Sequence, residues 1–203
     1  MSATTPPGLR VVSNEQTLAA ESVVTDGRRL RGGASRRALL DAATAVLVDR
    51  GVGALTHRAV AERAGVPLAR VSYHFPTVED LMVAAAGRYV ADFDERLRRM
   101  AAAARSGRRS VVEACTDFLY ELVTDGAGEF LAVVEVRLAL RRRGRRVEAD
   151  GVLGVIRSFG VGDEQAASIA ASMFGFAVLA ATEASPPARS QVRSFVRTVL
   201  EGR

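Results

Sequence analysis

Two short helical segments joined by a glycine-containing turn constrain the fold of this 203-residue chain more than any other feature. The first segment begins after Thr56, whose side-chain oxygen can cap a free backbone N–H group, and stops at Gly65, which enters the left-handed conformation without a Cβ penalty. Pro67 follows where a second helix has its N1 position, because the missing N–H of proline is no loss there. The stretch from Thr56 to Phe75 is therefore predicted to fold as a helix-turn-helix.

The second segment of this motif separates into an inward and an outward face. Leu68, Val71 and Phe75 recur at three- and four-residue spacing and are expected to face inward. The remaining side chains are small or able to form hydrogen bonds, as the reading of a DNA groove requires, and they are Ala69, Arg70, Ser72, Tyr73 and His74. Arg70 could donate two hydrogen bonds to a guanine, and the other polar side chains could reach phosphates or base edges. An ordinary helical hairpin with a solvated face fits the same spacing.

The region from Arg37 to Leu81 carries a series of short matches to a known family. They are Gly51 with Leu55-Thr56, then Ala59-Val60-Ala61, Ala64-Gly65-Val66, Tyr73-His74-Phe75 and Glu79-Asp80-Leu81. In their order and spacing the chain resembles the N-terminal DNA-binding domain of the TetR family of bacterial transcriptional regulators. Two positions depart from the family pattern. Leu68 stands where many relatives have a polar or basic residue, and Val78 stands where a lysine often touches phosphate.

The resemblance implies an all-α protein with an N-terminal three-helix helix-turn-helix DNA-binding domain and a helical C-terminal ligand-binding and dimerisation domain. Because residues 1–33 show no sustained hydrophobic periodicity, we expect them to form a disordered tail. The DNA-binding domain is expected over 34–80, and the ligand-binding and dimerisation domain over 81–203. The candidate DNA-binding residues are Thr56, His57, Arg58, Pro67, Leu68, Ala69, Arg70, Ser72, Tyr73, His74 and Thr77.

Positive charge is concentrated where the motif lies. The chain has a net charge of +5, and all 28 of its basic residues are arginine. The segment from Arg28 to Phe75 contains nine arginines and three acidic residues. Its net charge therefore exceeds the net charge of +5 that the whole chain has. This distribution suits the binding of phosphates. The arginines at positions 28, 29 and 31 could extend along phosphates or into the minor groove, although a solvated tail fits them equally.

Helices are expected on both sides of the motif. An apolar stripe that includes Leu39, Val46 and Leu47 predicts an amphipathic helix over 35–50, which Gly51 ends. After Pro76, Thr77 with an acid three residues later is a capping signal for a long helix that continues to about residue 104. The apolar face of this helix is interpreted as core first and as ligand contact second.

The rest of the chain reads as further helices, over 111–123, 129–140, 152–159 and 166–182, with a last one that follows Pro186 and Pro187. If this C-terminal part holds a cavity for an unidentified small-molecule effector, the candidate ligand-binding residues are Phe118, Glu121, Phe130, Val134, Glu135, Met173 and Phe174. The arginine run from Arg141 to Arg146 is interpreted as a solvated loop at a helix end, where cations favour the helix dipole.

The segment over 166–182 approaches the roughly 20 residues that a membrane span needs. It is dominated by alanine and diluted by serine, so we expect a helix buried on every side in a protein without a membrane segment. Asp163 is expected to cap it. Two adjacent apolar helices at the end of the chain suggest a subunit interface, and the resemblance implies a homodimer formed through them.

Catalytic and metal sites find little support. Both histidines fall within the helix-turn-helix, and the HExxH, GxSxG and P-loop patterns do not occur. Cys115 is the only cysteine and is expected to be a small core residue. We therefore expect no enzyme activity, no catalytic or metal-binding residues and no cofactor. The N-terminus lacks an apolar signal region, so a cytoplasmic location is expected.

Together these features predict a ligand-responsive transcriptional regulator, a repressor that binds palindromic operator DNA as a homodimer. The mechanism that the resemblance implies is that an effector moves the long helix after Pro76 and so releases the DNA. One alternative is an effector-independent DNA-binding or architectural protein. Another is an all-helical enzyme with an incidental helical hairpin.

Overall fold

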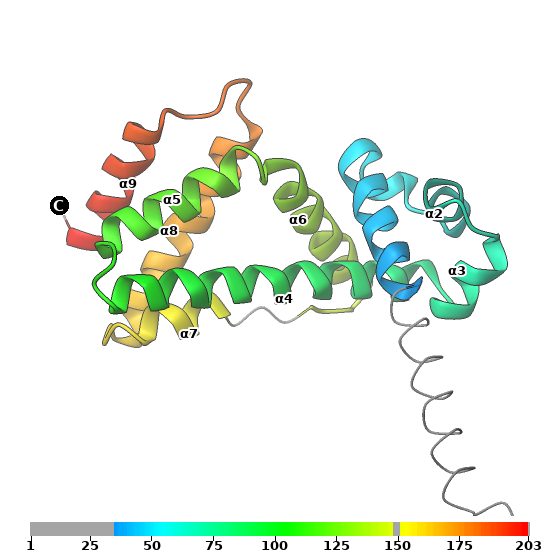
Figure 1. The fold of residues 1–203 in the computed structure, drawn as a ribbon, viewed down its shortest axis with the longest axis horizontal. Coiled ribbons are helices and arrows are strands. Elements are labelled where there is room, and N and C mark those ends of the chain that lie inside the picture. The colour runs from blue at the N-terminus through cyan, green and yellow to red at the C-terminus, as the bar shows by residue number, and fades with distance from the viewer. Residues whose placement is uncertain (1–34, 148–150, 203) are drawn as a thin grey trace, which may run out of the picture. The chain divides into compact units, whose positions relative to one another are not determined.

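A computed structural model describes residues 35–147 and 151–202, and every regular element in this part of the chain is a helix (Figure 1). The predicted all-α class is thus confirmed. Contacts divide the chain into two units, Met1–Ala38 and Leu39–Arg203, and every helix after residue 50 lies in the second. The tail predicted over 1–33, with its arginines at 28, 29 and 31, lies outside the described residues. The predicted boundary between residues 80 and 81 falls within one continuous helix and stays a prediction.

The DNA-binding region is built from short helices around one core. A helix that includes residues 39–50 is followed by the 3-10 helix η1 (Val52–Ala54), then α2 (His57–Ala64) and α3 (Leu68–His74). Their buried side chains meet those of the first turns of the next helix, and the most buried are Leu39, Ala43, Val60, Val71, Phe75, Leu81 and Ala86. The apolar stripe predicted for the first helix forms part of this core.

The long helix α4 (Val78–Arg105) begins with the predicted cap. The Thr77 hydroxyl accepts a hydrogen bond from the Asp80 backbone N–H at 3.0 Å, and the Asp80 carboxylate accepts one from the Thr77 backbone N–H at 3.3 Å. This reciprocal pair satisfies two N–H groups that have no partner within the helix. Figure 1 shows α4 as the long green helix that runs from α3 towards α5 and α7, both of which it contacts.

The remaining helices are α5 (Val111–Val123), α6 (Ala127–Arg142), α7 (Gly151–Arg157), α8 (Asp163–Thr182) and α9 (Arg189–Glu201). A second core forms where α5, α6, α8 and α9 meet, and its buried members include Leu119, Leu122, Phe130, Ala177, Val192 and Val196. The predicted cap of α8 is wrong by one residue. Gly162 occupies the N-cap position, and Asp163 instead pairs with Arg157 at 2.7 Å.

The helix α8 differs from its prediction as a helix buried on every side. Ala166, Ile169, Ala177 and Ala180 are its buried residues, whereas the side chain of Leu179 is 68% exposed. Within the described residues, α8 is also the one helix that is long and apolar enough to cross a membrane, by length and composition alone. Its inner face packs on α5, α6, α7 and α9, and the opposite face is exposed and carries Ala171 and Leu179 together with Ser168 and Ser172.

The helix α6 takes part in both cores. Val136 and Leu140, each with 0% exposure, pack with the DNA-binding region, whereas Phe130 packs in the second core. A single rigid element therefore has side chains in the interior of each part of the molecule.

Candidate nucleic-acid interface and ligand cavity

The turn of the helix-turn-helix is held by the caps that the sequence predicts. The Thr56 hydroxyl accepts a hydrogen bond from the Ala59 backbone N–H at 3.1 Å and so caps α2. Gly65 adopts a φ of 64° at the other end, and the Val66 N–H donates to the Ala61 carbonyl at 3.0 Å. These bonds close a left-handed helix end of the kind that glycine favours. Pro67 is the N-cap of α3 and not its predicted first residue.

Buried anchors fix the orientation of α3. Val71 and Phe75 are 0% and 2% exposed, so the inner face of the helix is tied to the core. The outer face carries Arg70, Ser72 and Tyr73, and the Tyr73 side chain is 83% exposed. Seven residues of helix thus present an arginine and a tyrosine to solvent from a fixed backbone. That geometry suits an element that enters a groove.

Leu68 and His74 differ from the rest of the helix. Leu68 is 50% exposed, so its predicted inward orientation is wrong. It is the first residue of α3, where no preceding turn of the same helix covers it. His74 is half-buried, and its ring lies edge-on to that of Tyr73 with centroids 5.3 Å apart. An aromatic contact of this kind restricts the Tyr73 rotamer.

The other candidate DNA-binding residues lie at the starts of α2 and α4. Arg58 is exposed and pairs with Glu62 at 3.1 Å, while His57 is half-buried. The hydroxyls of Thr56 and Thr77 serve as helix caps, although both residues are exposed. Ala69 is exposed next to Arg70, and Pro67 is exposed at the turn. Their contacts with DNA remain predictions.

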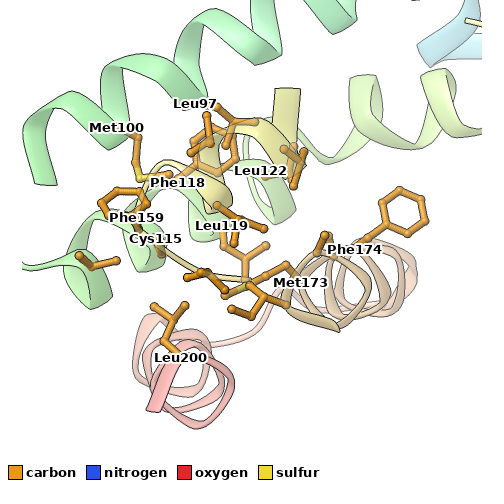
Figure 2. A pocket seen from close by; sticks show the side chains of 18 of the residues that line it. Leu97, Met100, Cys115, Phe118, Leu119, Leu122, Phe159, Met173, Phe174 and Leu200 are labelled. Carbon is orange, nitrogen blue, oxygen red and sulfur yellow. The ribbon is translucent and has the colours of Figure 1, made fainter. Parts of the chain in front are cut away.

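A cavity of about 440 Å³ lies in the second core (Figure 2). Helices α4 to α9 all contribute to its wall. The lining side chains are almost entirely hydrocarbon, with the sulfur atoms of methionine and cysteine, and they include Leu97, Met100, Cys115, Phe118, Leu119, Leu122, Phe159, Met173 and Leu200. Its volume is within the range of roughly 300 to 1,000 Å³ that small-molecule sites occupy.

Four of the predicted ligand-binding residues line this cavity, namely Phe118, Phe130, Met173 and Phe174. The other three lie elsewhere. Glu121 pairs with Arg96 at 3.0 Å, and Val134 packs in the second core outside the cavity lining. Glu135 accepts a hydrogen bond from the Val52 backbone N–H at 3.3 Å, so it contacts the DNA-binding region. The cavity gives these three residues no support as ligand contacts.

Sequence reasoning missed the part of the wall that α7 and its following loop contribute. Val152, Val155, Ile156 and Phe159 line the cavity, yet the sequence indicated only another short apolar helix. The signal that could have found them is the 3- and 4-residue spacing of these apolar side chains, which gives the helix one apolar face.

Electrostatically, the cavity is close to neutral. Burial raises the pKa of the Cys115 thiol to about 11, so the thiol is protonated at neutral pH. Burial likewise raises the pKa of Tyr89, on the neighbouring part of α4, to about 12, with Arg96 lowering it to a smaller extent. Among the described residues, no group of three or more His, Cys, Asp or Glu side chains could hold a metal ion.

Two arginines of the predicted solvated loop contact α4. Arg143 pairs with Glu79 at 3.4 Å, and Arg145 approaches Asp80 at 3.8 Å. The run from Arg141 to Arg146 is exposed as predicted, but it is not isolated from the DNA-binding region in space. With Glu135 on Val52, these contacts link α6 and the residues that follow it to the first turn of α4 and to η1.

Comparison with known proteins gives one family and a set of similar structures. The model for bacterial regulatory proteins of the tetR family matches residues 39–85. The multidrug binding protein EbrR complexed with ethidium is 26% identical, with a TM-score of 0.65 over 81% of this chain and 98% of EbrR. EbrR complexed with malachite green has the same identity and a TM-score of 0.66, over 81% of this chain and 96% of EbrR.

A TetR-family member from Streptomyces coelicolor A3, SCO1917, is also 26% identical, with a TM-score of 0.66 over 81% of this chain and 97% of that one. No match was found among curated protein sequences.

Proposed function

Because this chain belongs to the TetR family of bacterial regulatory proteins, we propose that it is a ligand-responsive transcriptional repressor that binds palindromic operator DNA as a homodimer in the cytoplasm. The observation that carries the proposal is the outer face of α3, where Arg70 and Tyr73 are exposed while Val71 and Phe75 hold the helix in the core. A helix presented in this way fits the major groove.

On DNA, each residue of this face has a distinct task. The guanidinium of Arg70 donates to guanine O6 and N7, a pairing that contributes about 1 to 3 kcal/mol of discrimination against the wrong base. Tyr73, Ser72 and the residues at the starts of α2 and α4 bind the backbone and fix the register. In a dimer, two copies of α3 spaced by about 34 to 36 Å meet half-sites one helical turn apart.

The dimer is proposed to form through α8 and α9. The outer face of α8 carries the exposed Ala171 and Leu179 and the half-buried Val178. Small and apolar side chains on one face allow two helices to approach closely and exclude water. A partner subunit on this face would cover the apolar side chains that the rest of the chain leaves exposed.

The cavity is proposed to bind the effector. Similar structures bind small molecules, since EbrR is described as a multidrug binding protein in complex with ethidium and with malachite green. Phe130 in the cavity wall and Glu135 on Val52 belong to the same helix, α6. A ligand that shifts α6 therefore acts on η1 and on the first turn of α4. To release DNA it needs to favour the other conformer by only about 1 to 3 kcal/mol.

The test is operator binding by the full chain, with a duplex selected from a random pool. Arg70→Ala and Tyr73→Ala should each weaken binding at least tenfold without changing the melting temperature by more than about 2 °C, because both side chains are exposed. Arg98→Ala is the control, since Arg98 is an exposed arginine on α4 outside the motif. Equal losses for all three variants would contradict the assignment of α3 as the reading helix.

If the chain is instead an effector-independent architectural protein, the same experiment should give a different result. It would coat DNA uniformly with a steep salt dependence, because phosphate contacts dominate non-specific binding. A footprint confined to a palindrome, and its loss on addition of a cavity ligand, would favour the regulator.

A further inference from the structure

The cavity in the second core has a wall chemistry that restricts which molecules it can hold. We propose that it takes neutral, largely apolar small molecules and discriminates against organic cations. The inference rests on the proposed role of this cavity as the effector site, and it adds the chemical class of the ligand.

The described lining of the cavity carries no charged side chain. Among the described residues that line the cavity, Gln165 supplies an amide and Cys115 a thiol, and all other side chains are hydrocarbon or thioether. A ligand that entered with a formal charge would lose its water and find no opposite charge in the wall. A neutral ligand loses little on leaving water and gains from apolar contact. One amide can orient a single polar group of such a ligand.

Two arginines lie close to aromatic rings of the cavity wall without lining the cavity themselves. The guanidinium carbon of Arg96 lies 5.5 Å from the centroid of Phe118, and that of Arg105 lies 5.7 Å from the centroid of Phe159. Both rings line the cavity. Each ring thus already interacts with a cation, which weakens its attraction for a second one. A neutral ring system does not depend on that attraction.

Three acids of α5 are already paired with arginines. On α5, Glu113 pairs with Arg189 at 3.0 Å, Asp117 pairs with Arg109 and Arg189, and Glu121 pairs with Arg96 at 3.0 Å. These carboxylates compensate arginines on the outside of the domain and are not directed at the cavity, whose lining includes none of them. None of these three carboxylates is therefore free to pair with a bound cation unless its ion pair with an arginine is broken.

The test compares two fluorescent dyes of similar size on the full-length protein. Nile red is neutral, and ethidium is a planar cation. Nile red should bind with saturation at one site per chain, and ethidium should bind at least tenfold more weakly. Alkylation of Cys115 by N-ethylmaleimide reports where the dye lies, because Cys115 is the only cysteine and it lines the cavity. Nile red should slow this reaction.

A matched pair of variants isolates charge from shape. Met173→Glu places a carboxylate in the wall and should raise ethidium affinity at least tenfold while lowering that of Nile red. Met173→Gln has nearly the same shape without the charge and should leave ethidium weak. Tight ethidium binding by the unchanged protein, or failure of Nile red to protect Cys115, would overturn the proposal. Nile red that binds and protects but leaves the operator complex intact would support the ligand class and contradict only the effector role.

Discussion

Neighbouring residues of α3 have opposite tasks, and the structure shows how each is enforced. Val71 is fully buried, while Arg70 and Ser72 on either side of it are exposed. Since the helix is only seven residues long, its orientation depends on Val71, on Phe75 at its end and on the turn before it. The turn therefore determines which residues of α3 face outward, and the proposed DNA recognition depends on it.

Gly65→Ala tests this dependence at the position where a left-handed backbone is required. Gly65 has a φ of 64°, and a Cβ placed there meets nothing within 4 Å, so the cost is conformational and not steric. We expect the free energy of unfolding to fall by about 1 to 2 kcal/mol, with weaker operator binding because α3 is re-aimed. Chemical denaturation of the purified variant gives the measurement.

The matched control is Gly53→Ala in η1. A Cβ at Gly53 also meets nothing within 4 Å, but the φ of Gly53 is not in the left-handed region. This substitution should change stability by less than about 0.5 kcal/mol, as for most surface positions. Equal losses at the two glycines would show that φ is not the cause.

At the scale of elements, ion pairs fasten α9 to α5. Arg189 bonds to Glu113 at 3.0 Å and to Asp117 at 2.5 Å, and Arg193 bonds to Glu113 at 2.6 Å. The hydrogen bond from Arg189 is the largest of the effects that hold the pKa of Glu113 below its ordinary value of 4.5. Because the folded-state pKa is lowered, the resulting stability is present above pH 4.5 and is lost as pH falls through the folded-state pKa.

Glu113→Gln should therefore lower the melting temperature at pH 7, and the difference from the unchanged protein should shrink as the pH falls below 4.5. Melting curves recorded by circular dichroism between pH 3 and 8 measure it. Glu95→Gln is the control, since it removes the same charge from exposed pairs within α4. A difference for Glu113→Gln that is constant over this pH range would contradict an electrostatic role.

Local signals predicted the helices and most of their caps, because a cap is decided by a few adjacent residues, although Pro67 and Asp163 each lie one position from their predicted place. Thr56, Gly65 and the pair of Thr77 and Asp80 behave as their types indicate. Burial of α8 was not predicted, because composition does not tell which elements cover a helix. The wall of the cavity likewise needs α4 and α7 side by side, and the pairing of Arg143 with Glu79 joins residues 64 positions apart. Neither is encoded in any local pattern.

At the scale of the whole molecule, the two proposed activities meet in α6 and in the exposed face of α8. Helix α6 has side chains in both cores, and the exposed face of α8 carries apolar side chains that the rest of the chain leaves uncovered. A dimer through this face would set the separation of the two α3 helices. A shift of α6 on ligand binding would then change the separation of the two α3 helices.

Ala171→Arg in the outer face of α8 tests the dimer. A buried, unpaired guanidinium is not tolerated in an apolar interface, so the variant should sediment as a monomer while keeping its helical content. Since two linked half-site contacts reinforce each other, operator affinity should fall by about a hundredfold or more. Ala102→Arg adds the same side chain to an exposed position of α4 and should change neither property. A variant at Ala171 that remains dimeric in analytical ultracentrifugation would show that the subunits meet elsewhere.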